Sequence, residues 1–295
     1  MAPPIRSLLF VPGDSEAKAQ KALASEADAI ILDLEDAVAP EAKGRARETV
    51  RAVLDGADRG GKPVFVRINA LDTGLAAADL AAVMGGRPWG VVLPKYRQEQ
   101  DIHQLGFYLE ALEAREGIDA GATRLLIVAT ETAAAAHNLG QPYRLHSPRL
   151  WGAMWGGEDL AAELGSVSNR DGEGRYTFPF LYARSQCLYG ASALGIVAVD
   201  AVHTNFRDLE RLEAETREGL RDGFIAKAAI HPAQVGVINK VLTPDASQVA
   251  WAEQVTALLA DQGVARLDGK MIDLVHKRIA DRILERATSF GLGTR

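Results

Sequence analysis

Short apolar segments alternate with longer amphipathic segments along most of the chain. Eight apolar segments have the length of β-strands, and several are apolar at every position, as in strands covered on both faces. They span residues 7–11, 29–34, 64–68, 90–93, 125–130, 150–155, 196–199 and 228–230. Helices are predicted between them at residues 16–24, 41–54, 75–83, 99–116 and 208–221. This alternation favours an α/β fold, a TIM (β/α)8 barrel, with an open doubly wound sheet as the alternative.

The pattern changes after residue 242. Residues 246–260 are predicted to be helical and residues 262–270 to form a loop. A final amphipathic helix is predicted at residues 271–288, because its apolar residues recur every three to four positions. We therefore divide the chain into a barrel domain, residues 1–242, and a C-terminal helical extension, residues 243–295, that packs on the barrel or on a neighbouring subunit.

Composition and charge exclude several classes of protein. Hydrophobic residues make up 47% of the 295 positions and charged residues 24%, which allows a large core and argues against disorder. A net charge of -6 disfavours a nucleic-acid or anionic-membrane binder. The single cysteine, Cys187, excludes an internal disulfide and a Cys-rich zinc site, and its helical context predicts a packed position. The chain shows neither a signal peptide nor an apolar run of about 20 residues, so a cytoplasmic protein is expected.

Polar side chains follow most of the predicted strands, at the point where each strand ends. They are Asp33, Glu35 and Asp36 after the second, Arg67 and Asn69 after the third, Lys95 after the fourth, Glu131 after the fifth, Glu158 and Asp159 after the sixth, and His231 after the eighth. Active sites of (β/α)8 barrels lie at these carboxyl ends. The pattern therefore predicts an active site rather than a set of helix caps.

Carboxylates dominate this set. Clustered carboxylates without cysteine, and with few histidines, indicate a hard cation such as Mg²⁺ rather than zinc. Glu131 and Asp159 follow adjacent strands, which suits a site with two protein carboxylates. For Asp36 and Glu158, capping of the following helix is an equally good explanation.

Arg67 is the cation expected to face these acids. Its planar guanidinium suits a substrate carboxylate or an oxyanion, and an internal salt bridge to Asp33 or Glu35 is the alternative. Gly156 and Gly157 leave room for a ligand to approach backbone N–H groups.

Other polar residues give weaker signals. Lys18 and Lys21, on the first predicted helix, are candidates for contacts with phosphates, although single surface lysines are common. His231 is a candidate base, although a His-Pro pair before a helix more often forms a turn. Signatures of serine hydrolases, dinucleotide-binding folds and P-loop enzymes are absent.

An ordered set of motifs resembles the citrate lyase β-subunit family, which includes malyl-CoA and citramalyl-CoA lyases. The motifs are RSLLFVPGDS, ILDLEDAVAPEAK, VFVRIN, LPKY, ATET, MWGGEDL and AIHPAQ, between residues 6 and 242. The resemblance implies a TIM barrel that binds Mg²⁺, with Mn²⁺ as a substitute, and that cleaves or forms a C–C bond. The bond joins a 2-oxo acid (glyoxylate, pyruvate or oxaloacetate) to an acetyl-CoA-type thioester.

The resemblance also assigns roles to individual residues. Glu131 and Asp159 match metal ligands, and Arg67 matches the arginine that holds the oxo acid and the developing oxyanion. Further substrate contacts are implied at Gly157, Glu158 and Asp159, and contacts with CoA at Phe10, Lys21, Ile230 and His231.

Asp273 in the motif DGKMID resembles a catalytic acid/base that a neighbouring subunit donates. Without the resemblance, Asp273 would be an ordinary acid near a helix start. A catalytic Asp273 implies a homo-oligomer, a trimer or a hexamer. Asp36 stands where related pyruvate aldolases have a histidine base, which disfavours an aldehyde-condensing aldolase.

Three alternatives to the lyase stay open at this point. One is a citryl-CoA lyase subunit, which would need a basic surface to dock a carrier protein. Another is a catalytically idle CoA-binding regulatory protein, although the metal carboxylates and Arg67 are all present. The last is a thioesterase outcome, in which water attacks the thioester.

Overall fold

Eight parallel strands form a closed barrel in the computed structural model, which describes residues 4–56, 58–138 and 147–292. Each strand pairs with the next, and β1 pairs with β8 to close the ring. The strands are β1 (Ser7–Pro12), β2 (Ala29–Asp33), β3 (Val64–Arg67), β4 (Gly90–Leu93), β5 (Arg124–Val128), β6 (Leu150–Met154), β7 (Val197–Asp200) and β8 (Ala226–Ala229). The predicted TIM barrel is confirmed, and the open doubly wound sheet is excluded.

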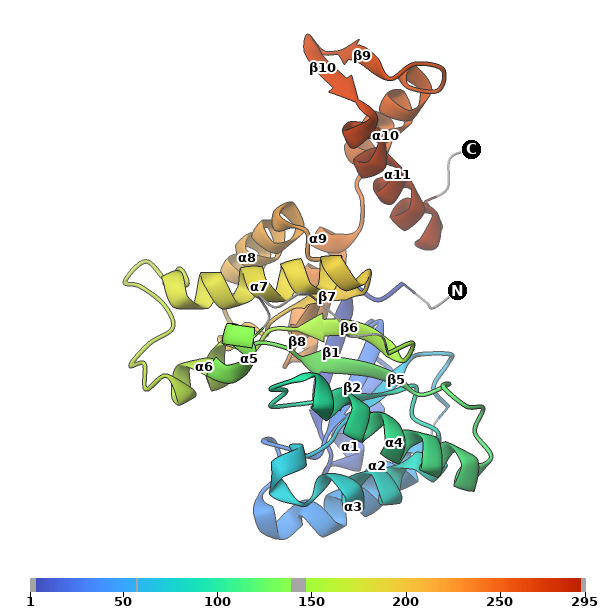
Figure 1. Cartoon of the computed structure of the whole chain (residues 1–295), viewed down its shortest axis with the longest axis vertical. Helices are drawn as coiled ribbons and strands as arrows, with labels where there is room; N and C mark the ends of the chain where they lie inside the picture. Colours follow the sequence, from blue (N-terminus) through green and yellow to red (C-terminus); the bar gives the residue numbers. More distant parts are fainter. Residues whose placement is uncertain (1–3, 57, 139–146, 293–295) are drawn as a thin grey trace.

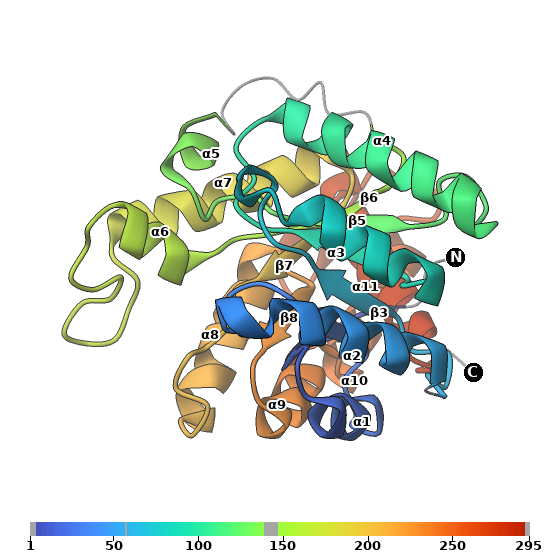
Figure 2. The same cartoon turned by 90° about the horizontal axis from the view of Figure 1, so that it is seen from below.

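Helices cover the outside of the barrel (Figure 2). They are α1 (Glu16–Leu23), α2 (Lys43–Gly56), α3 (Ala76–Val83), α4 (Glu99–Glu116), α5 (Ala133–Asn138), α6 (Gly157–Glu163), α7 (Phe178–Leu194), α8 (Leu209–Asp222) and α9 (Pro232–Leu242). Short 3-10 turns lie at η1 (Pro40–Ala42), η2 (Leu71–Thr73) and η3 (Met84–Gly86). The five helices predicted in this region lie within two residues of α1, α2, α3, α4 and α8.

The strands bury side chains on both of their faces, as their continuous apolar character predicts. Ile31 points into the barrel with Phe65 and Leu126, whereas its neighbours Ile30 and Leu32 pack outward against the helices. Cys187 is buried in the outer layer, as expected, and burial raises the pKa of its thiol.

Three aromatic rings close the barrel at the N-terminal ends of its strands. The Phe65 ring lies 4.9 Å from that of Trp89 and 5.4 Å from that of Trp151, centroid to centroid. Trp89 and Trp151 also meet edge to face at 5.8 Å. These rings fill the interior of the barrel at this end, so a site for polar chemistry is expected at the opposite end, the C-terminal rim.

Strand β8 begins two residues before the predicted start and ends one residue before the predicted end, at Ala226–Ala229 instead of 228–230. The predicted strand began after the charged residue Lys227. Lys227 is nevertheless only 3% exposed, because its ammonium lies 3.2 Å from Asp200 Oδ2 and donates to the Ala201 carbonyl at 2.7 Å.

The C-terminal tail contains α10 (Ala246–Leu258), a hairpin of β9 (Val264–Leu267) and β10 (Lys270–Asp273), and α11 (Leu274–Ser289). The predicted loop at 262–270 and the predicted helix start at 271 were therefore wrong. Asp268 and Gly269 form the two-residue turn with φ of 48° and 76°, a conformation that lets β9 and β10 pair antiparallel.

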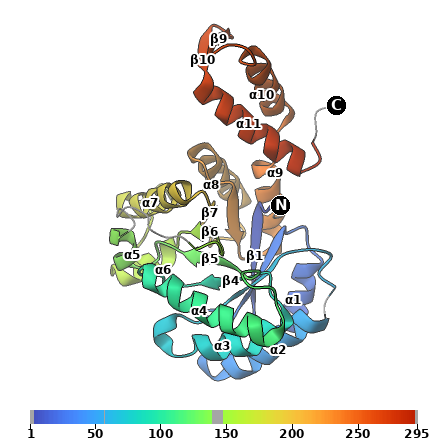
Figure 3. The ribbon, with the colours of Figure 1, turned by 45° about the vertical axis from the view of Figure 1, so that its right-hand side comes forward.

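The tail joins the barrel at the end opposite the rim and extends away from it (Figures 1 and 3). Arg6, just before β1, donates to Thr243 Oγ1 at 2.8 Å, and its guanidinium lies 4.3 Å from the centre of the Phe290 ring. Among the described residues, no helix is both long and apolar enough to cross a membrane.

Candidate active site

Arg67 and Asp33 end two neighbouring strands and form a two-pronged ion pair at the C-terminal rim. They are paired in the β2–β3 register, and Arg67 Nε and Nη2 donate to the two Asp33 oxygens at 2.7 and 2.6 Å. Arg67 Nη1 lies 2.9 Å from Glu35 Oε2. Burial alone would lower the pKa of Arg67, but the two carboxylates raise it, so Arg67 stays charged. The salt bridge considered for Arg67 is therefore formed.

Hydrogen bonds to the backbone hold the loop that carries Glu35. Asp33 accepts from the N–H groups of Glu35 and Ala37 at 2.8 and 3.1 Å. Lys43 donates to the carbonyls of Leu34 and Glu35, both at 2.7 Å. The loop thus presents its acids from a fixed backbone.

Lys95 lies among four carboxylates that come from three different loops. Its Nζ is 2.5 Å from Asp159 Oδ1, 3.3 Å from Asp36 Oδ2, 3.5 Å from Glu35 Oε1 and 3.6 Å from Glu131 Oε2. Burial alone would lower the pKa of Lys95, but the surrounding carboxylates raise it. Burial also raises the pKa of Glu35 to about 7. Sequence analysis identified Lys95 only as a polar residue at the end of a strand. No local sequence pattern predicts which distant loops will lie beside it.

Glu131 is almost completely buried, with 2% of its surface exposed. Burial raises its pKa to about 8, although Lys95 opposes this shift. The backbone N–H of Lys95 donates to Glu131 Oε1. A Cβ on Gly156 would lie 2.6 Å from Glu131 Cβ, so only glycine lets the loop after β6 approach this closely. A carboxylate in such a position is stabilised in its charged form by a nearby cation.

Glu158 and Asp159 lie in the first turn of α6, whose N-cap is Gly156. The capping role considered for Glu158 was therefore wrong. Its Oε1 instead accepts from Asn169 Nδ2 at 2.7 Å. The 3-10 turn after Asp36 is capped by Ala39, so Asp36 is not a cap either.

A pocket at the rim brings together six of the predicted site residues: Phe10, Arg67, Glu131, Gly157, Glu158 and Asp159. Its wall is completed by Val128, Met154, Trp155, Gly156, Tyr176, Ala201 and Val202. The Arg67 guanidinium lies 5.0 Å from the centre of the Phe10 ring. A Cβ on Gly157 would lie 2.8 Å from the Trp155 ring, so glycine is required where the wall passes this tryptophan.

The remaining predicted contact residues lie outside this pocket wall. Ile230 and His231 follow β8 at the rim, and His231 caps α9 by accepting from the Ala233 N–H at 3.1 Å. The turn considered for His231 thus takes the form of a helix cap. The His231 ring also stacks on Phe206, 4.7 Å between centroids. Lys21 is exposed on α1.

Asp273 is the N-cap of α11 in the tail. Its Oδ1 accepts from the Val275 N–H at 2.9 Å and the His276 N–H at 3.3 Å, and His276 Nδ1 lies 2.8 Å from the same oxygen. The hydrogen bonds from His276 hold the pKa of Asp273 below its usual range. Because the tail leaves the barrel at the end opposite the rim, Asp273 does not join the pocket of its own chain (Figure 1).

The donor set at the rim fits a divalent cation that keeps open coordination positions. Among the described residues, no group of three or more His, Cys, Asp or Glu side chains is arranged to hold a metal. Glu131 and Asp159 nevertheless both lie within 3.6 Å of one positive charge, the Lys95 ammonium. Magnesium commonly takes one or two protein carboxylates and completes its octahedron with water and substrate oxygens. These two residues therefore suit Mg²⁺ better than a metal held in a protein-only cage.

A closed (β/α)8 barrel with paired acids and an arginine in a rim pocket defines a barrel enzyme. Residues 6–232 match the HpcH/HpaI aldolase/citrate lyase family, and residues 185–292 match the family of C-C bond lyases of the TIM-barrel fold. The chain belongs to the HpcH/HpaI aldolase/citrate lyase family and is a carbon–carbon lyase.

Individual relatives agree over nearly the whole chain. A (3S)-malyl-CoA thioesterase of Cereibacter sphaeroides is 35% identical over 291 residues, covering 97% of this chain and 95% of the relative. The mitochondrial citramalyl-CoA lyase of Rattus norvegicus is 32% identical over 307 residues, covering 97% and 87%. The crystal structure of the protein CitE from Mycobacterium tuberculosis in complex with magnesium, acetoacetate and coenzyme A superposes with a TM-score of 0.80 at 34% identity, covering 97% and 98%.

Proposed function

We propose that this enzyme cleaves, or forms by Claisen-type condensation, the C–C bond between a 2-oxo acid and an acetyl-CoA-type thioester. The observation that carries the proposal is the rim pocket, where the paired carboxylates Glu131 and Asp159 lie beside Arg67. The citramalyl-CoA lyase relative supports this reaction, and the CitE complex supports Mg²⁺ and a CoA ligand. We propose glyoxylate, pyruvate or oxaloacetate as the 2-oxo acid.

Glu131 and Asp159 would hold Mg²⁺, with Mn²⁺ as a substitute. The bound ion would supply a Lewis acid and a template for the oxo acid. Arg67 offsets the negative charge that develops on oxygen during bond cleavage, and its ion pairs with Asp33 and Glu35 fix the guanidinium in place. Gly157 and Glu158, on the same pocket wall, orient the carboxylate end of the oxo acid.

The CoA portion would approach from the β1–β8 side of the rim. Phe10 lines the pocket itself, and Ile230 and His231 continue that side at the end of β8. Lys21 is exposed on α1, the helix that follows β1, where an ammonium can meet phosphates. The stacked ring of His231 offers a flat surface beside this path.

Asp273 would act in a neighbouring subunit, taking the substrate hydroxyl proton in the cleavage direction. The side-chain contacts that fix Asp273 all involve Oδ1, so Oδ2 is the atom that we expect to accept the proton. A tail that leaves the barrel opposite the rim supports exchange between subunits of a trimer or a hexamer.

A thioesterase is the second candidate, because the C. sphaeroides relative carries that name. The two reactions give different products from malyl-CoA or citramalyl-CoA. A lyase releases glyoxylate or pyruvate and leaves the thioester bond intact, whereas a thioesterase releases free CoA thiol. Both products should be followed with Mg²⁺ and with a chelator. Oxo acid without free thiol supports the lyase; thiol without oxo acid supports the thioesterase; neither product from any 3-hydroxyacyl-CoA rejects both.

Mixed oligomers test the role of Asp273. Asp273→Asn should retain Mg²⁺ binding and lose most turnover, about 100-fold or more, as expected for removal of a general base. Glu131→Gln should also be inactive. Co-refolding the two inactive variants should restore part of the activity, because some sites then combine Glu131 of one chain with Asp273 of another. An inactive mixture would place the base elsewhere.

A further inference from the structure

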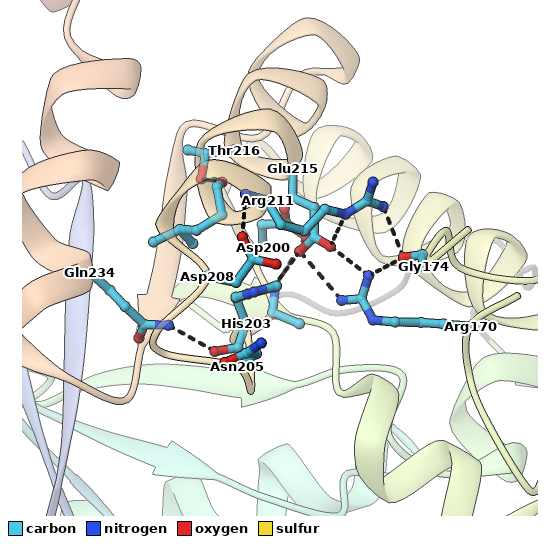
Figure 4. Close-up of polar contacts among 12 residues, drawn as sticks. Arg170, Gly174, Asp200, His203, Asn205, Asp208, Arg211, Glu215, Thr216 and Gln234 are labelled. Carbon is cyan, nitrogen blue, oxygen red and sulfur yellow. Dashed lines mark hydrogen bonds and ion pairs between the residues drawn. The ribbon is translucent and has the colours of Figure 1, made fainter. Parts of the chain in front are cut away.

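Glu215 binds side chains from two different rim loops, although it lies outside the pocket itself. It is on α8 and is 6% exposed. Arg170 Nη1 and Nη2 lie 2.5 and 3.3 Å from its two oxygens, and His203 Nδ1 lies 3.0 Å from Oε2. Arg211, one turn earlier on α8, donates to Oε1 at 3.0 Å. Figure 4 shows these groups converging on the one carboxylate.

Arg170 connects Glu215 to the loop between α6 and α7, residues 164–177. Its guanidinium lies 3.9 Å from the centre of the Tyr176 ring, and Nη1 donates to the Gly174 carbonyl at 2.8 Å. Tyr176 in turn meets the Trp155 ring edge to face at 4.9 Å, and both rings line the pocket.

The residue before Arg170 extends this connection to the oxo-acid end of the pocket. Asn169 is 8% exposed and donates to Glu158 Oε1 at 2.7 Å. The loop is closed on itself by the Thr177 N–H, which donates to the Asn169 carbonyl at 3.0 Å. Holding Arg170 therefore also holds the partner of Glu158.

His203 connects Glu215 to the opposite side of the pocket. It follows Ala201 and Val202, which line the pocket after β7. The His203 carbonyl accepts from Gln234 Nε2 at 2.8 Å (Figure 4). Gln234 Oε1 then accepts from the backbone N–H groups of Ile230 and His231 at 2.8 and 3.2 Å.

We infer that Glu215 is a positioning residue. From outside the pocket, it fixes the loops that contact the oxo-acid end and the CoA end of the substrate. The Glu215 carboxylate thereby connects two regions of the rim. One is the loop at residues 164–177, which contacts Glu158, and the other is the pair of loops after β7 and β8, which leads to Ile230 and His231. The inference rests on the proposed function for the identity of the two ligands. It predicts that loss of the Glu215 charge weakens the binding of oxo acid and CoA together, because neither loop keeps its anchor.

Glu113 provides a matched control. It is 1% exposed and accepts from Arg149 Nη1 and Nη2, both at 2.6 Å, at the N-terminal end of the barrel. Glu113→Gln and Glu215→Gln therefore break the same kind of buried arginine–carboxylate pair, one far from the rim and one behind it. A purely structural effect would appear in both variants.

The experiment compares wild-type protein with these two variants in three measurements. Calorimetry gives the dissociation constants of CoA and of pyruvate with Mg²⁺, and limited trypsin digestion gives the rate of cleavage after Arg170 and Arg175. For Glu215→Gln we expect both dissociation constants to rise about tenfold and cleavage to accelerate by a similar factor. Glu113→Gln should change none of these values. Glu215→Asp, which keeps the charge, should recover part of the loss.

Two outcomes would overturn the inference. One is unchanged dissociation constants in a folded Glu215→Gln protein; the other is equal weakening in Glu113→Gln. If Glu215→Gln does not fold, Arg170→Lys removes the two-pronged contact and is judged by the same criteria. Failure of the proposed function is distinguishable, because wild-type protein would then bind neither ligand. In that case the cleavage rates decide alone, and equal rates in the two glutamine variants would refute the anchoring of the loops.

Discussion

Glu113 and Glu131 are buried glutamates that lie near opposite ends of strand β5, and their pKa values differ widely. Glu113 binds the turn that leads into β5, and Glu131 follows the other end of that strand. They are 1% and 2% exposed. Yet the pKa of Glu113 is lowered to about 2, whereas that of Glu131 is raised to about 8. Burial alone therefore does not decide whether a carboxylate is stable as an anion.

The number of donors accounts for the difference. Burial by itself raises the pKa of Glu113, but Arg149 donates twice at 2.6 Å, and the N–H groups of Gly121 and Thr123 donate at 2.9 Å. Among the described residues, Glu131 accepts from the backbone N–H of Lys95, whose ammonium lies 3.6 Å away. A buried carboxylate with many hydrogen-bond donors stabilises the fold, whereas a buried carboxylate with few donors retains affinity for a cation.

The largest effect that tests this comparison is expected for Glu131→Gln. Turnover should fall about 1000-fold, equivalent to about 4 kcal/mol, because the variant loses a carboxylate of the proposed metal pair. The metal-free variant should melt no lower than wild-type protein, because burial disfavours the charge that is removed. An activity assay with Mg²⁺ measures the loss of turnover, and thermal melting with and without Mg²⁺ measures the stability and the response to the ion. Stabilisation of the variant by Mg²⁺ as large as that of wild-type protein would contradict the assignment.

The active end of β5 was partly predictable from sequence, whereas the structural end was not. Glu131 directly follows an apolar strand, and the rule that barrel sites lie at carboxyl ends identifies it. Glu113 lies within a long helix, and its partner Arg149 is 36 residues away, so no local pattern pairs them. The contacts of Lys95 and of Glu215 were not predicted for the same reason, since they depend on loops that meet only in the folded barrel.

One missed element did carry a local signal. The Asp268–Gly269 pair is a strong marker of a two-residue hairpin turn, because both positions need a positive φ. The flanking residues alternate weakly, with Val264 and Met271 exposed and Ile272 buried, so the hydrophobic periodicity was dominated by the helix that follows. The Asp-Gly pair was therefore a better predictor of the β9–β10 hairpin than the hydrophobic periodicity.

A smaller effect, on stability rather than on turnover, is expected for Glu113→Gln. The shift of the Glu113 pKa from 4.5 to about 2 corresponds to about 3 kcal/mol of folding free energy. Because the folded-state pKa is depressed, this contribution is present above about pH 4.5 and is lost as the pH falls towards 2. Urea unfolding of both proteins from pH 6 down to about pH 3 should show their difference in free energy shrinking. A difference that stays constant over this range would contradict the comparison.

The smallest effect is expected for Lys95→Met, which removes the ammonium group near Glu131 at the C-terminal end of β5. The metal-free protein should lose about 1–2 kcal/mol of unfolding free energy, since protonation of a neighbouring acid limits the repulsion among the carboxylates. Saturating Mg²⁺ should narrow the deficit, because the ion supplies the missing positive charge to Glu131 and Asp159. Lys227→Met is the matched control, since Lys227 is buried beside Asp200 on the outer face of the barrel. Its deficit should be larger and should not respond to Mg²⁺. If Mg²⁺ left the loss of unfolding free energy in Lys95→Met unchanged, the Lys95 ammonium would have a purely structural role. Glu113 and Glu131 would then not differ as a structural carboxylate and a metal-binding carboxylate.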